Sequence, residues 1–324
     1  MLLPLLLPLL LLLLLPPPHL SRAAPPRTKS LSTKSLSPSQ STLLRVFSGG
    51  LAGTVSSTLT SPLEVVKTQL QSSAGAARSP AEVARAILKA DGAAGFWRGL
   101  PPTLVGIIPA RSIYFYSYES SKAFLAGRLS VTGTANALAA GLCAGVAANT
   151  ATNPIWMVKT RMQLLQSAGS ARYAGYGDAV RTIFREEGVG GFYRGVTASY
   201  WGASEGMIQF VAYERIKAAL RARNGGREGT KRELFLAAGA SKALATVATY
   251  PHEVARTRMR EFARGGAFKY EGMFQTLGVI AREEGARGLY AGMGTHVARV
   301  VPNSAVMFCV YEIVKEWIDD NQSS

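Results

Sequence analysis

Three short stretches of the chain have a proline followed five residues later by a basic side chain, and in two of them an acidic side chain lies three residues before that base. They are SPLEVVKTQLQ (61–71), NPIWMVKTRMQ (153–163) and YPHEVARTRMR (250–260). Charges at this spacing share one face of a helix, and a proline within the helix bends its axis. One copy alone would be an ordinary ion pair at a helix end. Three copies predict a ring of charges, the proline-side ring, whose members are Glu64, Lys67, Trp156, Lys159, Glu253 and Arg256.

In the proline-side ring, the acid of one copy can reach the base of the next copy. The second copy carries Trp156 where the other two have glutamate, so at most two such pairs can form. Exposed ion pairs contribute only about 0.2 to 1 kcal/mol, while partly desolvated pairs contribute more. The ring is therefore predicted to act as a latch that ligand binding can open.

A second ring of charges, the tyrosine-side ring, is predicted from the stretches YESSK (118–122), YERIK (213–217) and YEIVK (311–315). All three copies keep the acid and the base, so this ring is complete. With three pairs against two, we expect the resting protein to close the tyrosine-side ring and to open the proline-side ring. The tyrosine-side ring consists of Tyr118, Glu119, Lys122, Tyr213, Glu214, Lys217, Tyr311, Glu312 and Lys315.

These charged stretches belong to three sequence repeats. A further motif lies between the two stretches of each repeat, and its copies are DGAAGFWRG (91–99), EGVGGFYRG (187–195) and EGARGLYAG (284–292). Each repeat thus predicts an apolar helix with a proline kink, a polar connector with a short amphipathic helix, a glycine turn and a second apolar helix. The fold class expected is an all-α membrane protein, with six transmembrane helices in three pseudo-threefold repeats and the short helices on one side.

We expect the repeats to span residues 43–125, 130–221 and 232–318. Ser79 and Glu82 have the spacing of a capping box, which predicts the start of the first short helix. Residues 1–42 are expected to be a low-complexity extension, disordered or used for targeting. The part of it after residue 20 is rich in Ser, Pro and basic residues, a composition shared with organellar targeting segments.

Composition supports a bundle of membrane-spanning helices. Hydrophobic residues make up 48% of the chain, and the mean hydropathy is +0.12. The stretches 46–63 and 129–158 contain no charged residue and are rich in small residues, which let helices approach closely in lipid. Cys143 and Cys309 lie in apolar surroundings, so we expect buried core thiols and no disulfide or metal site.

The formal net charge of +16 suits nucleic acid, an anionic lipid surface or an anionic solute. A nucleic-acid-binding protein would place its charges on one soluble face, and the long uncharged stretches argue against that class. Four ionisable residues fall inside the predicted spans, where such groups usually face a cavity or a partner. They are Arg111, Glu205, Lys242 and Arg299.

The three motifs resemble the signature of the mitochondrial carrier family, P-x-[DE]-x-x-[KR] followed by [DE]-G-x-x-x-x-[WYF]-[KR]-G, over about residues 43–318. The variants PIWMVKTRMQ and YPHEVARTRMRE resemble the pyrimidine nucleotide carrier branch, next to carriers of NAD, FAD and folate. The resemblance implies that the proline-side ring closes the matrix side and the tyrosine-side ring the cytosolic side. It also implies that Gln71 and Gln163 brace the matrix-side gate.

The resemblance further implies solute-contact positions seven residues after each turn glycine, at Gly106, at Gly202 with Ala203, and at Arg299. Glycine or alanine lets a flat ring approach the backbone, and an arginine fork suits phosphate. For Arg299 we favour solute binding. Two interpretations of the other ionisable residues stay open, namely direct contact with the solute and an interhelical ion-pair network, and they concern Arg111, Glu205 and Lys242.

The function expected is the exchange of nucleotides, most of all pyrimidine nucleotides, across the mitochondrial inner membrane by alternating access. The alternatives are a carrier of NAD, FAD or folate, and a carrier-fold scaffold that does not transport. We expect no enzymatic activity, cofactor, metal or nucleic acid. The expected partners are an anionic solute and membrane lipid, with cardiolipin as the candidate lipid, and the protein is expected to be a monomer.

Overall fold

A computed structural model describes residues 38–164, 173–262 and 268–323; the side chains of 38–49, 301, 308, 311, 315 and 317–323 are not described. This part of the chain is helical and contains no strand, which confirms the predicted all-α class. The helices are α2 (Pro38–Gln71), α3 (Pro80–Asp91), η1 (Ala93–Trp97), α4 (Leu100–Leu129), α5 (Gly133–Leu164), α6 (Tyr176–Phe192), α7 (Val196–Arg223), α8 (Lys231–Met259), α9 (Met273–Glu283), α10 (Gly285–Leu289) and α11 (Met293–Ser323).

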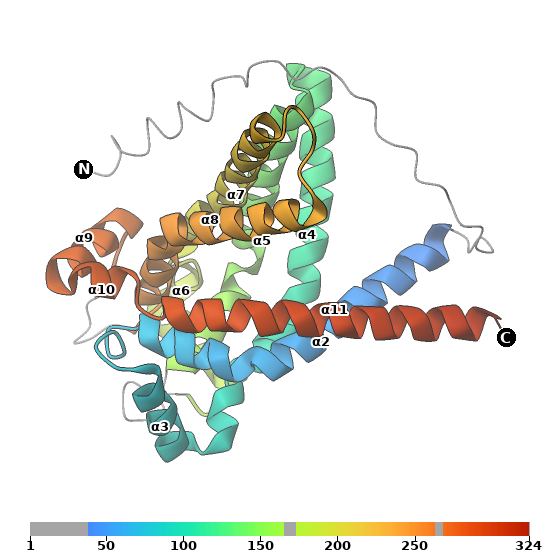
Figure 1. The fold of residues 1–324 in the computed structure, drawn as a ribbon. Coiled ribbons are helices and arrows are strands. Elements are labelled where there is room, and N and C mark those ends of the chain that lie inside the picture. Colours follow the sequence, from blue (N-terminus) through green and yellow to red (C-terminus); the bar gives the residue numbers. More distant parts are fainter. Residues whose placement is uncertain (1–37, 165–172, 263–267, 324) are drawn as a thin grey trace.

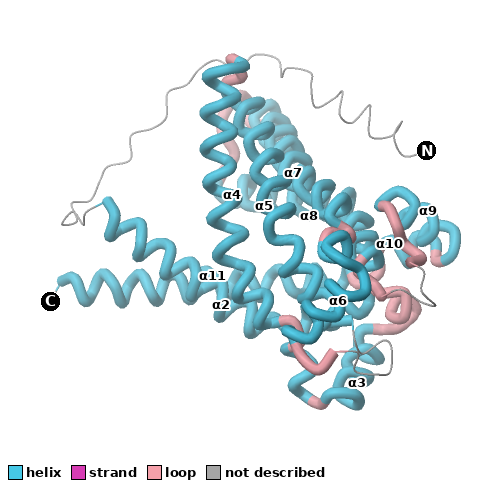
Figure 2. Tube along the Cα trace, turned by 180° about the vertical axis from the view of Figure 1, so that it is seen from behind, coloured by secondary structure: helices cyan, strands magenta, loops and turns pink. Residues whose placement is uncertain are grey.

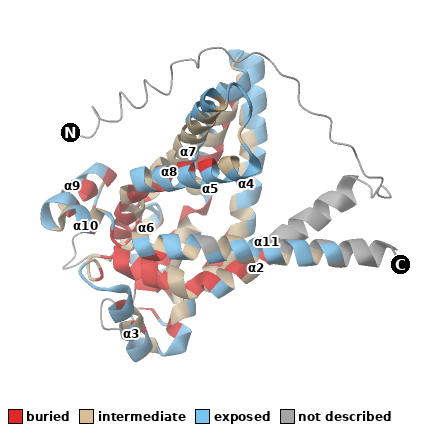
Figure 3. Cartoon of the chain, viewed as in Figure 1, coloured by how far each residue is buried: buried red, intermediate tan, exposed pale blue. Residues whose placement is uncertain are grey.

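The described helices follow the predicted repeat of long, short and long elements three times. The long helices pair across the repeat boundaries, α2 with α11, α4 with α5, and α7 with α8. Figure 1 shows these helices drawing together at the end that carries α3, α6 and α9, and spreading apart toward the other end. The view from behind shows the same divergence between the α2 and α11 pair and α4 (Figure 2). The buried residues gather where the helices meet (Figure 3).

Each proline motif lies inside one continuous helix. Pro62, Pro154 and Pro251 are interior residues of α2, α5 and α8. The charged residues that follow each proline lie at the end where the helices meet, as a proline bend that tilts them inward would require. The fold therefore brings the three copies of the proline motif together.

The glycine motif adopts the same backbone conformation in every repeat. Its first glycines, at 92, 188 and 285, have φ of 64°, 65° and 65°, and its last glycines, at 99, 195 and 292, have φ of 81°, 77° and 76°. Side chains disfavour this left-handed region, which explains why glycine recurs at both positions. The motif is thus a fixed turn that directs the chain from the short helix into the next long helix.

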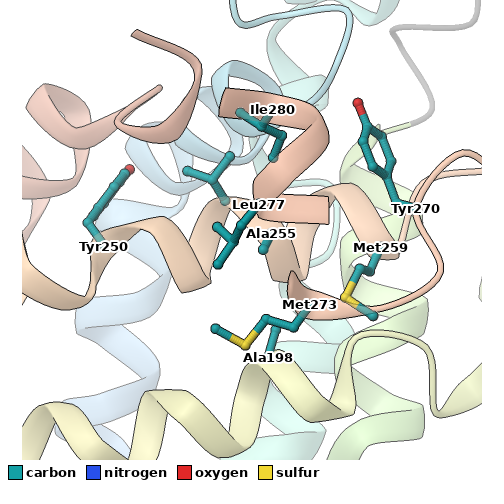
Figure 4. Close-up of a cluster of buried hydrophobic side chains, with 9 residues drawn as sticks. Ala198, Tyr250, Ala255, Met259, Tyr270, Met273, Leu277 and Ile280 are labelled. Carbon is teal, nitrogen blue, oxygen red and sulfur yellow. The ribbon is translucent and has the colours of Figure 1, made fainter. Parts of the chain in front are cut away.

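The short helices begin and pack as amphipathic elements. The predicted capping box is confirmed, because Ser79 Oγ accepts from the Glu82 N–H and the Glu82 carboxylate accepts from the Ser79 N–H. The hydrogen bond from the Ser79 N–H holds the pKa of Glu82 below its ordinary value. In the third repeat, the apolar face of α9 packs on α8, with Leu277 and Ile280 beside Ala255 (Figure 4).

By length and apolar composition alone, the described residues contain one candidate membrane span, Gly285–Val314. The long helices also carry polar residues within their spans, such as Asn136, Asn149 and Asn153 in α5. Helices that pack around a polar interior have this composition.

The prediction of buried core thiols is wrong. Cys143 and Cys309 are both exposed in the structure. An apolar sequence environment does not distinguish the inside of a helix bundle from its outer face, because lipid-facing residues are apolar as well.

Candidate functional site

The proline-side ring is closed by two ion pairs between different repeats. Lys67 of α2 pairs with Glu253 of α8, and Lys159 of α5 pairs with Glu64 of α2. All four side chains are largely buried, with exposed fractions between 9% and 16%. Each acid thus reaches the base of the following repeat, and two such pairs form, as the spacing predicted.

The third corner of the proline-side ring lacks its acid. The nearest carboxylate oxygen to Arg256 belongs to Glu253 of the same helix, at 3.5 Å, and Glu253 already serves Lys67. Trp156 fills the vacant position, and its Nε1 donates to Thr152 Oγ1 at 2.8 Å. Arg256 therefore shares a carboxylate within its own repeat, where a complete ring would give it one from α5.

Arg299, the contact position of the third repeat, reaches the proline-side ring. Its Nη2 lies 3.2 Å from Glu64 Oε2, while the other oxygen of Glu64 binds Lys159. The Nε of Arg299 is buried and has no hydrogen-bond partner among the described residues. One carboxylate thus serves both a ring lysine and the arginine proposed to bind solute.

A second layer of hydrogen bonds joins the same three helices next to the ring. Thr68 Oγ1 donates to Gln163 Oε1 at 2.9 Å, and Thr257 Oγ1 donates to Gln71 Oε1 at 2.9 Å. At the third join, Arg260 takes the place of glutamine and its Nη1 donates to the hydroxyl of Thr160 at 3.1 Å. Gln71 and Gln163 therefore lie where braces would act, with threonine hydroxyls as their partners across the helices.

Two of the predicted contact positions are covered by side chains of the chain itself. A Cβ at Gly106 would lie 3.1 Å from atoms of Ile155 and of the Trp156 ring, and a Cβ at Gly202 would lie 2.9 Å from His252 Nε2. The flat ring that approaches the Gly106 backbone is thus an indole of this protein. Ala203, beside Gly202, instead lines an open cavity.

Two of the other ionisable residues in the spans lie against each other. Lys242 Nζ lies 2.8 Å from Glu205 Oε1, and Thr246 Oγ1 donates to the same oxygen at 3.0 Å. Glu205 and Lys242 therefore form an interhelical pair between α7 and α8. Arg111 is exposed and has no carboxylate partner within the described ranges.

The described side chains of the tyrosine-side ring are not assembled into a ring. Glu119, Glu214 and Glu312 are exposed, and the structure places none of them against a base of another repeat among the described side chains. Lys122 lies over the ring of Tyr118 in its own helix, and Lys217 lies 4.0 Å from Glu228. Tyr213 is half-buried. The side chains of Tyr311 and Lys315 lie outside the described residues.

The expected resting state is therefore the reverse of what the structure shows. The prediction compared three pairs with two and left out other bonds at the proline side. The second layer of hydrogen bonds, made by Thr68 and Thr257 and here called the threonine layer, and the Arg299 contact with Glu64 add to the two ring pairs there. A neutral hydrogen bond contributes about 0.5 to 1.5 kcal/mol and one to a charged group about 1.5 to 3 kcal/mol, so together these contacts are enough to reverse a difference of one ion pair.

Two cavities lie along the inner faces of α5 and α7. The first, of about 360 Å³, lies at the proline-side ring, and the second, of about 670 Å³, is lined by residues nearer the open end, among them Tyr114, Tyr118, Gly141, Ala203 and Phe210. Ser199 of the first cavity and Ala203 of the second are one helical turn apart. The lining changes from charged at the ring to aromatic and small toward the opening.

A family profile described as mitochondrial carrier protein matches residues 38–129, 130–224 and 230–322, which together form most of the chain. The chain belongs to the mitochondrial carrier family. The carrier is 42% identical over 306 residues to solute carrier family 25 member 36-A of Danio rerio, covering 84% of this chain and 96% of that protein.

Two further relatives match the carrier over most of their length. Solute carrier family 25 member 33 of Homo sapiens is 36% identical over 314 residues, covering 87% of this chain and 97% of that protein. Mitochondrial carrier protein rim2 of Schizosaccharomyces pombe is 38% identical over 313 residues, with 85% and 90% covered. These matches identify the carrier as a membrane transporter and not an enzyme.

Two buried arginines that were not predicted as site residues hold the carrier's repeats together. Arg161 binds both oxygens of Glu187, and Arg258 binds both oxygens of Glu284, with distances of 2.7 and 2.6 Å in the second case. Arg258 Nε also donates to the Gln71 carbonyl oxygen of the first repeat at 2.6 Å. A sequence signal was present, because a base follows the ring base by two residues in the second and third motifs.

The threonine layer was also missed, although a threonine follows the ring base in every copy of the motif. We expect Thr257→Val to lower the unfolding free energy of the purified carrier by about 1 to 3 kcal/mol, because it leaves the buried side-chain oxygen of Gln71 without its donor. Thr249→Val is the matched control, since Thr249 donates only within its own helix, to the Ala245 carbonyl oxygen. Equal shifts in the unfolding midpoint would contradict a bracing role.

A double-mutant cycle on Lys67 and Glu253 tests the ring pair of the carrier. Glu253→Gln leaves the largely buried Lys67 without a carboxylate, and Lys67→Gln leaves Glu253 with only the longer contact to Arg256, whereas the double change removes both charges. We expect a coupling of about 1 to 3 kcal/mol in the unfolding free energy, so that the double variant is less destabilised than the sum of the singles. If the losses of unfolding free energy in the two single variants added up to the loss in the double variant, the two charges would be independent.

Proposed function

We propose that this carrier exchanges pyrimidine nucleotides across the mitochondrial inner membrane by alternating access. The observation that carries the proposal is the excess of basic side chains around the cavity at the proline-side ring, next to Arg299. An anionic solute with a phosphate chain suits such surroundings, because an arginine fork binds phosphate oxygens in pairs.

The choice of pyrimidine nucleotides is supported by sequence. The carrier has Trp156 in place of the second acid, together with the run RTRMRE in the third repeat, and both features resemble the pyrimidine nucleotide branch. The cavity lined by Tyr114, Tyr118 and Phe210 offers aromatic and small side chains, against which a base can pack.

We propose that the proline-side ring is the matrix-side gate and that the tyrosine-side ring is the cytosol-side gate. In these terms the structure has its cavity open toward the cytosol, with the matrix side closed by two ion pairs. Breaking those pairs while the tyrosine-side pairs form would expose the same cavity to the matrix.

Membrane lipid is the second partner that we propose. An apolar groove of about 520 Å³ lies where the first and second repeats meet, and Val105, Val189 and Tyr193 in it are exposed. Exposed apolar side chains of a membrane protein suit acyl chains, and we include cardiolipin among the lipids bound. The working unit proposed is a monomer that binds no nucleic acid.

Exchange in liposomes tests the function. Liposomes that contain the purified protein and labelled UTP would be placed in UTP, CTP, ATP, NAD, FAD or folate, with protein-free liposomes as the control. We expect efflux driven by UTP and CTP. Efflux driven only by NAD, FAD or folate would assign the carrier to those solutes. The absence of all efflux from folded protein would favour a scaffold.

A further inference from the structure

The basic charge around the proline-side ring is not balanced within the described residues. Two carboxylates serve four bases, since Glu64 binds Lys159 and Arg299 while Glu253 binds Lys67 and Arg256. A fifth base, Arg260, is 5% exposed and is bound only by uncharged groups. Uncompensated charge in a water-poor interior is unfavourable, so this arrangement favours an added anion.

The surplus is concentrated at the corner where Trp156 replaces an acid. Arg260 donates to Asn153 Oδ1 at 2.8 Å and to the Trp156 carbonyl oxygen at 3.3 Å, and its buried Nε has no partner. Arg256 lies in the last turn of α8, four residues before Arg260, and 30% of its side chain is exposed. Trp156, Arg256 and Arg260 all line the 360 Å³ cavity.

The two arginines differ in what they offer to a ligand. Arg256 is accessible from the cavity and holds its own-helix carboxylate only at 3.5 Å, so its guanidinium can turn toward an incoming anion. Arg260 is already fixed by its three hydrogen bonds to α5. It contributes positive potential from a fixed place, without a conformational change when the anion arrives.

We propose that the phosphate chain of the bound nucleotide occupies this corner and supplies the negative charge that a second-repeat carboxylate would otherwise supply. Arg256 contacts the phosphate oxygens, and Arg260 strengthens the field at the same point. This inference rests on the proposed nucleotide exchange. It assigns a specificity-determining role to Trp156, because a glutamate there would neutralise Arg256 and repel phosphate.

If phosphate binds at this corner, the affinity of the carrier for a nucleotide depends on the number of its phosphates. Three surplus positive charges are compensated more fully by a triphosphate than by a monophosphate, whose single phosphate must be shared with Arg299. The position of the aromatic cavity along the same faces of α5 and α7 agrees with this, because a base held near Ala203 directs its phosphates toward the ring.

The test compares Trp156→Glu with Trp156→Gln, two variants of the same shape that differ in charge. The KM for external UTP and for UMP would be measured in liposomes, and the thermal shift of the purified protein with inorganic triphosphate would be recorded. We expect the preference for UTP over UMP to fall at least about tenfold in the glutamate variant relative to the glutamine variant, which is the loss of one charge-assisted contact. The thermal shift with triphosphate should fall in parallel.

Equal UTP-to-UMP preferences in the two variants would overturn the inference while leaving nucleotide exchange intact. If the wild-type carrier exchanges no nucleotide at all, the proposed function itself fails. Should the Trp156 variants not fold, Arg256→Gln gives the decisive comparison. We expect it to raise the KM for UTP about tenfold and the KM for UMP much less, and an equal rise for both would overturn the proposal.

Discussion

Arg299→Ala is expected to lower nucleotide exchange by at least about 100-fold. Arg299 is the basic residue at a predicted contact position, and it supplies a forked donor that suits phosphate. Losing two charge-assisted hydrogen bonds amounts to about 3 kcal/mol or more, which corresponds to a factor of this size. The measurement is the initial rate of UTP exchange in liposomes.

Arg299→Lys separates the contribution of the forked guanidinium geometry from that of the positive charge. It keeps a cation near Glu64 but offers a single donor point, so we expect an intermediate loss of about tenfold. The unfolding midpoint of both variants would be measured to show that the protein is folded. A wild-type exchange rate in folded Arg299→Ala would remove this residue from the solute site.

Arg258→Ala is expected to destabilise the carrier by about 3 to 5 kcal/mol, because it removes one partner of a buried, doubly bonded ion pair. The side chain is 1% exposed and also binds the first repeat through the Gln71 carbonyl oxygen. Its loss leaves the Glu284 carboxylate without its two hydrogen bonds and creates a cavity between the third and first repeats. The thermal unfolding midpoint of the purified protein, measured in detergent, checks this prediction.

Arg98→Ala is the matched control for Arg258→Ala. In the first repeat a glutamine, Gln69, stands where Arg258 stands in the third, and the motif acid Asp91 pairs with Arg98, whose side chain is 28% exposed. Because Arg98 is partly exposed and makes one bond to its acid, we expect its removal to cost less than that of Arg258, about 1 kcal/mol. If Arg98→Ala and Arg258→Ala lowered the midpoint equally, burial would not be the cause of the effect.

Much of the architecture could be predicted because repetition removes ambiguity. Three copies of the proline motif predict three helices with an internal proline, and the structure places Pro62, Pro154 and Pro251 inside long helices. The two interrepeat ion pairs follow from the same pattern, since one acid is missing. The repeating glycines likewise correspond to left-handed turns.

The partners of individual side chains could not be predicted in the same way. Gly106 was assigned to a solute ring, but its open face is covered by Trp156, a residue far away in the sequence. Contacts of this kind depend on which helix faces which across a repeat boundary, and spacing within one helix carries no information about that. The same limit applies to Glu205, whose partner Lys242 lies on another helix.

Glu64 binds two basic side chains, and this links the binding of solute in the central cavity to the stability of the closed proline-side ring. Because this carboxylate is bound by both Lys159 and Arg299, a solute that draws Arg299 away leaves the gate with weaker attraction. Thermodynamic reciprocity then requires the converse, that a firmer gate lowers the affinity for solute by the same factor. A variant with a tighter proline-side ring should therefore bind nucleotide more weakly, even when every contact with the nucleotide is unchanged.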